Sequence, residues 1–292
     1  MIKVKFLILS FLVTNIIYSQ NKTEMAIYNI GKGSFAGGVG AIINKKPNEK
    51  TGKVFLKGFL QGGVGGYLVY ESKNFILKVS DNNKLEYAWG AKFINSIGSS
   101  IVENASLNQD FWNIWHFNVG YNRIEVHTKN KIKIKYKIMP VALLLTGIYA
   151  YGNKFELEKS LKTGEILFSL SKNFKHAGAT WGKLILIDES WLDKNNLIAH
   201  EIIHSYQYED FNFVNTFINK PKLELLNKSK LGEKLNNFFY FDLQAPIFGG
   251  LYLLEKKRGG GITITIIFSN MKQGSFLTLY VLMTKISIGV KG

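Results

Sequence analysis

Ala199-His-Glu-Ile-Ile-His-Ser-Tyr-Gln207 carries the strongest structural and chemical signal in the chain. Residues four positions apart on a helix lie on one face, so His200 and His204 would point the same way. Two imidazoles in that arrangement can bind one zinc ion, and Glu201 would stand where it can take a proton from a metal-bound water. The chain has only five histidines, so a chance occurrence of this spacing is improbable.

The residues before this segment predict a strand followed by a helix. Residues 182–187 form a short apolar run, and residues 188–190, Asp-Glu-Ser, are typical of a helix start. We expect the helix to run from about Trp191 to Tyr208, because its apolar positions follow helical spacing: Leu197, Ile198, Ile202 and Ile203. A strand that leads into a helix is the context in which His-Glu-x-x-His binds metal.

The segment resembles the metal-binding helix of the zincin superfamily of metallopeptidases, of the kind that uses a glutamate as third ligand. The resemblance covers this helix and the preceding strand only. It implies that His200 and His204 bind Zn²⁺, that Glu201 is the general base, and that the substrate is a peptide or protein. In such enzymes the strand commonly lies beside the cleft, where an extended peptide can pair with its edge.

A catalytic zinc site needs a third protein ligand, and several carboxylates are candidates. The longer pattern HExxHxxGxxH is not followed, because Gln207 stands at the glycine position and Asp210 at the last one. Glu224 lies twenty residues after His204, a spacing that suits a ligand on the next helix, and it is the preferred candidate. Three further glutamates are weaker candidates: Glu209, Glu233 and Glu255.

The C-terminal tail offers another explanation for the uncertain third ligand. From Lys256 to Gly292 it contains no Asp or Glu, and its composition differs abruptly from that of the segments before it. Back-translation with AT-rich codons lets residues 262–279 encode, in another frame, a segment containing Glu-Tyr-Glu-Ala. That segment resembles the third-ligand helix of glutamate zincins. We hypothesise that residues 259–292 are frameshifted and that this version of the chain is an impaired enzyme.

The N-terminal residues predict export. A basic start precedes an apolar run from Phe6 to Tyr18, which is typical of a signal peptide spanning residues 1–20. We expect cleavage near Ser19 or Gln20, with an uncleaved anchor as the alternative. The mature chain would then be periplasmic, cell-surface or secreted. Cysteine is absent, which excludes disulfide and thiolate chemistry.

The chain is strongly basic, with a formal net charge of +16. This charge favours attraction to an anionic surface of the cell envelope. The lysines are thinly spread and arginine occurs only at positions 123 and 258, so we expect no specific recognition of nucleic acid. The sequence does not indicate an oligomeric state.

We expect an α+β protein, in which a glycine-rich antiparallel β region over residues 21–170 precedes a helical zincin-like region over residues 171–258. The glycine clusters in residues 27–90 match neither GxGxxG nor GxxxxGK[ST], which excludes the usual dinucleotide and P-loop sites. Dense glycine suggests turns, bulges and closely packed strands, with a hairpin turn at residues 81–84.

Periodicity predicts the remaining elements. An amphipathic helix is expected at 91–107, and later helices at 222–240 and 246–257. Strands are expected at 112–119, 123–127, 131–138 and 141–151. The strict alternation at 131–138 predicts one wet and one buried face, and the apolar run at 141–151 predicts a buried strand.

The remaining candidate residues carry weaker signals. His116 and His127 are expected to be structural, whereas His176 could line a cleft. Trp181 and Tyr206 could border a substrate pocket. An alternative function is a non-catalytic envelope or surface protein, rich in β structure and with a degenerate metal site. The signal peptide, the 14% aromatic content and the alternating strand favour that alternative.

Overall fold

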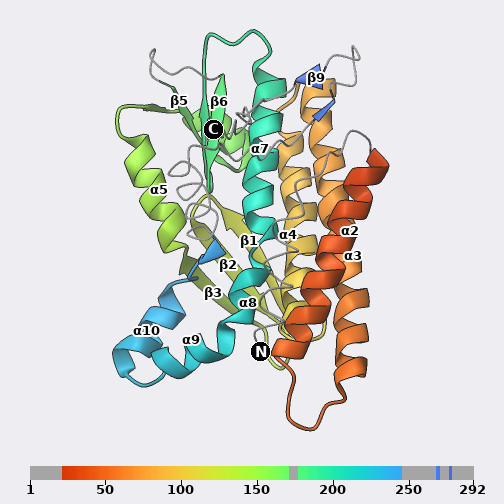
Figure 1. Cartoon of the computed structure of the whole chain (residues 1–292). Coiled ribbons are helices and arrows are strands. Elements are labelled where there is room, and N and C mark those ends of the chain that lie inside the picture. Colours follow the sequence, from red (N-terminus) through yellow and green to blue (C-terminus); the bar gives the residue numbers. More distant parts are fainter. Residues whose placement is uncertain (1–21, 171–176, 245–267, 270–275, 278–292) are drawn as a thin grey trace, which may run out of the picture. The chain divides into compact units, whose positions relative to one another are not determined.

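The computed structural model describes residues 22–170, 177–244, 268–269 and 276–277, and this part of the chain is mostly helical (Figure 1). Three long helices come first: α2 (Lys22–Ile43), α3 (Thr51–Asp81) and α4 (Tyr87–Ser106). A three-stranded sheet follows: β1 (Ile114–Val119), β2 (Asn122–His127) and β3 (Lys133–Ile138). The next elements are α5 (Pro140–Ala150), β4 (Lys154–Phe155), α6 (Leu157–Thr163), β5 (Ile166–Ser169), β6 (Gly178–Trp181) and β7 (Leu184–Ile187). The last helices are α7 (Lys194–Asp210), α8 (Phe213–Phe217), α9 (Asn219–Leu226) and α10 (Lys230–Phe238).

The predicted glycine-rich antiparallel β region is wrong, because the glycines form the contact between α2 and α3. A Cβ atom on Gly33 would lie 2.3 Å from the carbonyl oxygen of Gly62, and one on Gly37 would lie 2.2 Å from that of Gly58. Glycine costs a helix about 1 kcal/mol relative to alanine. Here the lack of a side chain lets two helix backbones touch, which no larger residue would allow.

The predicted hairpin turn at residues 81–84 is also wrong, because the turn there connects helices α3 and α4 and not two strands. Asn83 has a φ of 51°, in the left-handed region that asparagine tolerates. The backbone N–H of Lys84 then donates to the carbonyl oxygen of Val79 at 3.2 Å. The predicted helix at 91–107 is confirmed as α4, which begins earlier, at Tyr87.

The three predicted strands before residue 139 are confirmed as the antiparallel sheet β1-β2-β3. One face of this sheet is polar and buried, and it carries His116, Asn118, Arg123 and Glu125. On the opposite face of β3, Ile134 is 69% exposed and Tyr136 is 51% exposed. The alternation at 131–138 is therefore real, but the face with the large apolar side chains is the exposed one.

The predicted buried strand at 141–151 is wrong, because these residues form α5. Proline is favoured in the first turn of a helix, and Pro140 stands there. The carboxylate of Asp242 accepts hydrogen bonds from the backbone N–H groups of Val141 (3.0 Å) and Ala142 (2.8 Å). These bonds satisfy two of the donors that a helix start leaves free.

A second sheet has the order β4-β5-β7-β6. Strand β7 is the predicted strand at 182–187, and all four of its residues are buried. It pairs in parallel with β5 and antiparallel with β6, so the expectation that its own edge could take up a peptide is wrong. Among the described residues β6 is the edge strand on this side of the sheet. Helix α7 packs against both β6 and β7.

The predicted helix at 222–240 is two helices, α9 and α10, separated by residues 227–229. Ser229 caps the second helix, because its hydroxyl oxygen accepts a hydrogen bond from the N–H of Gly232 at 3.0 Å. The predicted helix at 246–257 lies outside the described residues.

Residues 26–245 form one compact unit, and residues 1–25 and 246–292 group separately. In the second group, β8 (Phe268–Ser269) pairs antiparallel with β9 (Phe276–Leu277). Within the described ranges, no helix has the length and apolar character needed to cross a membrane. The predicted signal peptide lies outside the described residues, as does most of the tail, so both interpretations stay predictions.

Candidate functional site

Helix α7 carries the His-Glu-x-x-His segment and begins at Lys194, three residues later than predicted. The side chain of Asp193 accepts a hydrogen bond from the N–H of Asn196 and caps the helix. The helix buries the apolar side chains that the sequence singled out: Leu197, Ile198, Ile202 and Ile203. His200 and His204 are only partly buried, so the pair lies at the edge of the packed core.

The structure brings the two predicted histidine ligands together. The Nε2 atoms of His200 and His204 lie 3.1 Å apart, and the two rings are nearly perpendicular. Two nitrogen ligands of one tetrahedral zinc, each about 2.0–2.1 Å from the ion, would be about 3.3 Å apart. The separation of the two Nε2 atoms is therefore within a few tenths of an ångström of the one that a shared zinc ion requires.

Both imidazoles are uncharged near neutral pH. Burial lowers the pKa of His200 to about 4, with a further contribution from His204. Burial also lowers the pKa of His204, although its hydrogen bond to Gln207 acts in the opposite direction. Neutral imidazole is the species that coordinates metal ions.

Gln207 belongs to this site through a contact with His204. In the sequence it stood out only as a departure from the longer zincin pattern. Its Oε1 atom lies 2.9 Å from Nδ1 of His204. An amide oxygen can only accept, so Nδ1 carries the proton and Nε2 presents its lone pair. The i, i+3 spacing of the two residues on a helix is the sequence signal that could have identified this contact.

The side chain of Glu201 packs against the edge strand β6. The hydroxyl of Thr180 donates to its Oε2 atom at 2.6 Å, and a Cβ atom on Gly178 would lie 2.8 Å from its Oε1 atom. Burial raises the pKa of Glu201 to about 7, and the bond from Thr180 lowers it only in part. Thr180 could not be predicted from the sequence, because only the pairing of β6 with β7 brings it against α7.

The third ligand is not found in the part of the chain that the structure describes. Among those residues, no group of three or more His, Asp or Glu side chains could hold a metal ion. Glu224, the preferred candidate, is exposed on α9, and Glu233 is exposed on α10. The structure therefore does not bring Glu224 to the two histidines. Glu255 lies outside the described residues.

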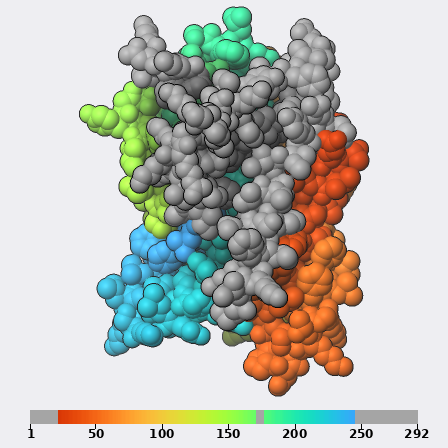
Figure 2. All heavy atoms as spheres, in the orientation of Figure 1, coloured from red at the N-terminus to blue at the C-terminus, as the bar shows by residue number. Residues whose placement is uncertain are grey.

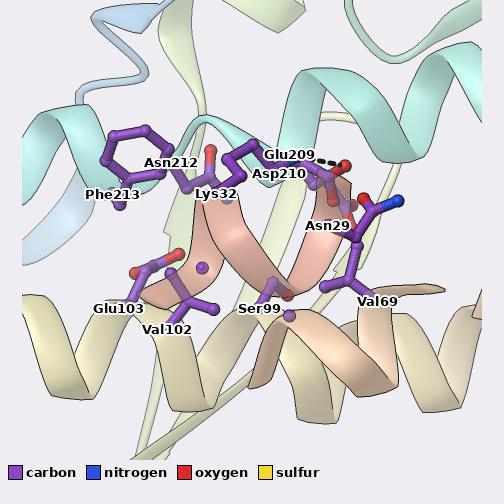
Figure 3. Close-up of a pocket in the computed structure, with 12 residues that line it drawn as sticks. Asn29, Lys32, Val69, Ser99, Val102, Glu103, Glu209, Asp210, Asn212 and Phe213 are labelled. Carbon is purple, nitrogen blue, oxygen red and sulfur yellow. Dashed lines mark hydrogen bonds and ion pairs between the residues drawn. The ribbon is translucent and has the colours of Figure 1, made fainter. Parts of the chain in front are cut away.

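Asp210, at the end of α7, forms ion pairs with α2 and α3, and Figure 3 shows the one with Lys32 of α2. Its Oδ2 atom binds the ammonium groups of Lys32, at 2.8 Å, and Lys73. Burial raises the pKa of Asp210, but these two lysines more than offset that effect, so its pKa is lowered. Asp210 is therefore a structural anchor between α7, α2 and α3.

Glu209, the last residue but one of α7, has a similar role. It binds Lys183, and the side-chain amide of Asn95 donates to it at 2.7 Å. Burial raises the pKa of Glu209, but Lys183 and then Lys92 outweigh this and hold it at about 2. The carboxylate is therefore charged, and its partners lie in α4 and in the turn between β6 and β7.

The cavity in Figure 3 is lined by residues of α2, α3, α4 and the end of α7. Its volume is about 10 Å³, which has room for roughly one water molecule. Two buried atoms that line it, Asp210 Oδ1 and Asn212 Nδ2, have no hydrogen-bond partner among the described residues. The cavity is too small for a peptide, so it is not a substrate site.

The other residues singled out in the sequence lie apart from the histidine pair. His116 is buried between the hydroxyls of Ser99 and Ser100, each 3.0 Å away, and His127 lies 3.2 Å from Glu125.

The two aromatic candidates have different surroundings. Tyr206 is fully buried, and its hydroxyl donates to the carbonyl oxygen of Ala88 at 3.3 Å, so it belongs to the core. Trp181, at the end of β6, is 38% exposed and stacks on Tyr149 with a centroid distance of 5.0 Å. His176 lies outside the described residues.

Comparison of the chain with family models, with curated proteins and with solved structures found no match.

Proposed function

We propose that this chain is built as a zinc-dependent peptide hydrolase of the zincin kind, exported from the cytoplasm. The observation that carries the proposal is the 3.1 Å separation of the Nε2 atoms of His200 and His204 on α7. Both rings are neutral near pH 7, and Gln207 orients one of them with its Nε2 lone pair available.

Each part of the site has a distinct role. His200 and His204 would hold the zinc ion. Bound zinc supplies Lewis-acid chemistry and makes a water molecule acidic near neutral pH. Glu201 would accept the proton of the attacking water and return it to the leaving amine, which a buried carboxyl can do in both directions.

The arrangement of β6 supports a peptide as substrate. Within the described ranges this strand is the edge of its sheet, and no other strand there pairs with the outer side of its backbone. An extended peptide can add to such an edge through main-chain hydrogen bonds. Thr180 of β6 contacts Glu201, so a peptide paired there would lie next to the general base.

We further propose that hydrolysis is impaired in this version of the chain. Catalytic zinc sites use three protein ligands, and only two stand together among the described residues. Two imidazoles alone would bind zinc weakly. The frameshift hypothesis for residues 259–292 accounts for the loss of the third ligand.

The alternative of an envelope protein rich in β structure loses its glycine-rich β region, although the alternating strand that favoured it is present as β3. The glycine-rich residues form α2, α3 and α4, not strands. The expected attraction of this chain to anionic surfaces rests on its net charge of +16 and does not require a β-sheet in the glycine-rich region.

A comparison of two reading frames tests the proposal. The present chain and a version with the frame restored after residue 258 would be loaded with zinc and assayed with a mixture of unstructured peptides. We expect cleavage by the restored version only. Glu201→Gln in that version should keep the bound zinc and abolish cleavage, whereas the exposed Glu158→Gln should change neither. Cleavage that survives Glu201→Gln would contradict the proposal.

A further inference from the structure

Helix α3 exposes a continuous stripe of large apolar side chains. Its five members share one side of the helix and are between 39% and 60% exposed: Leu56, Phe59, Leu60, Val64 and Tyr67. Their spacing of three and four residues places them in successive turns. Single exposed apolar residues are common on soluble proteins, but a contiguous patch marks a binding surface.

The stripe is not a by-product of core packing. In a typical surface helix the large apolar side chains face the core. In α3 the inner face is formed largely by glycines, including Gly58, Gly62 and Gly66, which touch the backbone of α2. The large apolar side chains are therefore on the outside, where they contribute little to folding.

Lysines stand in the loop before α3 and in its first turn, just before the stripe in the chain. Three of these lysines are exposed: Lys46, Lys50 and Lys53. The one acid in this loop, Glu49, is engaged, because it accepts hydrogen bonds from the N–H of Lys46 at 2.8 Å and from the side chain of Asn108 at 2.7 Å. Figure 2 shows the start of α3 (orange) at the edge of the molecule.

We propose that this α3 surface, the apolar stripe with Lys46, Lys50 and Lys53, binds the interface of an anionic lipid bilayer. Apolar side chains of a helix that lies flat on a membrane enter the boundary between headgroups and acyl chains, while lysines meet the anionic headgroups. Each lysine near such a surface contributes on the order of 1 kcal/mol.

The chemistry of the surface favours lipid over other partners. A second copy would set one strongly basic chain, with a formal net charge of +16, against another, and like charges oppose such a contact. A nucleic acid would use the lysines but not five exposed apolar side chains. The lysines act as point charges without the fork geometry of arginine, which suits a fluid surface of phosphates.

The surface is also preorganised. Glycine contacts fix α3 against α2, and Gly65 of α3 meets Gly98 of α4 in the same way. Binding would therefore require little ordering of the backbone, which preserves affinity.

Vesicle co-sedimentation of the full-length protein tests the proposal. We expect binding to phosphatidylcholine vesicles that contain phosphatidylglycerol, and much weaker binding to phosphatidylcholine alone. The double variant Lys50→Glu/Lys53→Glu should weaken binding about thirtyfold or more. Leu60→Ser/Val64→Ser should weaken it by about tenfold or more.

Matched variants control for changes in charge and hydrophobicity. Lys228→Glu/Lys230→Glu makes the same change in charge at exposed sites around the start of α10, and Leu225→Ser removes an exposed leucine from α9. Both should bind vesicles as the unmodified protein does. Because every variant keeps residues 1–21 and the tail, differences among them report on α3.

Three outcomes would overturn the proposal. One is the absence of binding to the anionic vesicles, and another is binding that neither α3 variant weakens. The third is a lipid-free dimer, seen by sedimentation equilibrium, that the Leu60→Ser/Val64→Ser variant dissociates. This last result would assign the surface to a second copy of the chain.

Discussion

The Oε1 atom of Gln207 accepts a hydrogen bond from Nδ1 of His204 at 2.9 Å. The contact fixes which ring nitrogen carries the proton, and it leaves Nε2 facing the Nε2 atom of His200. Metal-binding histidines in proteins usually have a partner of this kind on their second nitrogen. Gln207 is therefore a positioning residue for the proposed metal site.

Replacement of Gln207 should weaken zinc binding without unfolding the protein. Loss of such a partner typically costs tenfold to hundredfold in metal affinity, so we expect Gln207→Leu to raise the zinc dissociation constant by about that factor. Gln207→Glu keeps an acceptor at the same position and should stay close to the unmodified protein. Competition with a fluorescent chelator measures both constants. Equal affinities for the leucine and glutamate variants would show that the contact does not position His204.

Two glycines in α2 should respond in opposite ways to the same substitution. Gly31 has no atom within 4 Å of an added Cβ, so Gly31→Ala should stabilise the protein by about 0.5–1 kcal/mol through helix propensity. In Gly33→Ala the new Cβ would meet the carbonyl oxygen of Gly62 at 2.3 Å, and the two helices would have to separate. We expect a loss of about 1–3 kcal/mol. Urea unfolding followed by circular dichroism measures both changes, and a Gly33→Ala protein as stable as Gly31→Ala would contradict the packing of α2 on α3.

Acid should destabilise the protein through Glu209. Its pKa is about 2 in the folded protein, below the ordinary value of 4.5. Because the unfolded state binds the proton more readily, the stabilisation is fully present above about pH 4.5 and is lost as the pH falls toward 2. The shift corresponds to a contribution on the order of 3 kcal/mol.

The free energy of unfolding, measured at several values between about pH 5 and pH 3, tests this dependence. Glu209→Gln should make the decline with falling pH shallower. Glu158→Gln removes only an exposed ion pair with Lys162, which solvent screens, and should change the decline far less. An identical decline in all three proteins would show that Glu209 does not hold its charge through Lys183 and Lys92.

The sequence predicted local structure well where periodicity was strong. The strands β1 to β3, helix α4 and the helix that carries His200 all followed from alternation or from three- and four-residue spacing. The glycine-rich region was predicted wrongly, because the density of glycine was given more weight than its spacing. Gly58, Gly62 and Gly66 recur every four residues, which places them on one side of a helix.

The buried charges could not be predicted, because they join segments that are far apart in the chain. Asp210 and Lys73 are separated by 137 positions, and neither residue type is usually buried. The different roles of the histidines and Asp210 on α7 could not be predicted for the same reason. The spacing of the two histidines was visible in the sequence. Asp210, however, is excluded as a zinc ligand by its ion pairs with α2 and α3, and only the fold shows those pairs.

Equilibrium titration of the full-length protein with Zn²⁺, followed by isothermal calorimetry, tests the central claim most directly. We predict one zinc ion per chain, bound weakly, with binding lost in His200→Ala and in His204→Ala but retained in His127→Ala, which removes a histidine outside the pair. Zinc binding that persists in both His200→Ala and His204→Ala, or the absence of zinc binding by the unmodified protein, would contradict the account.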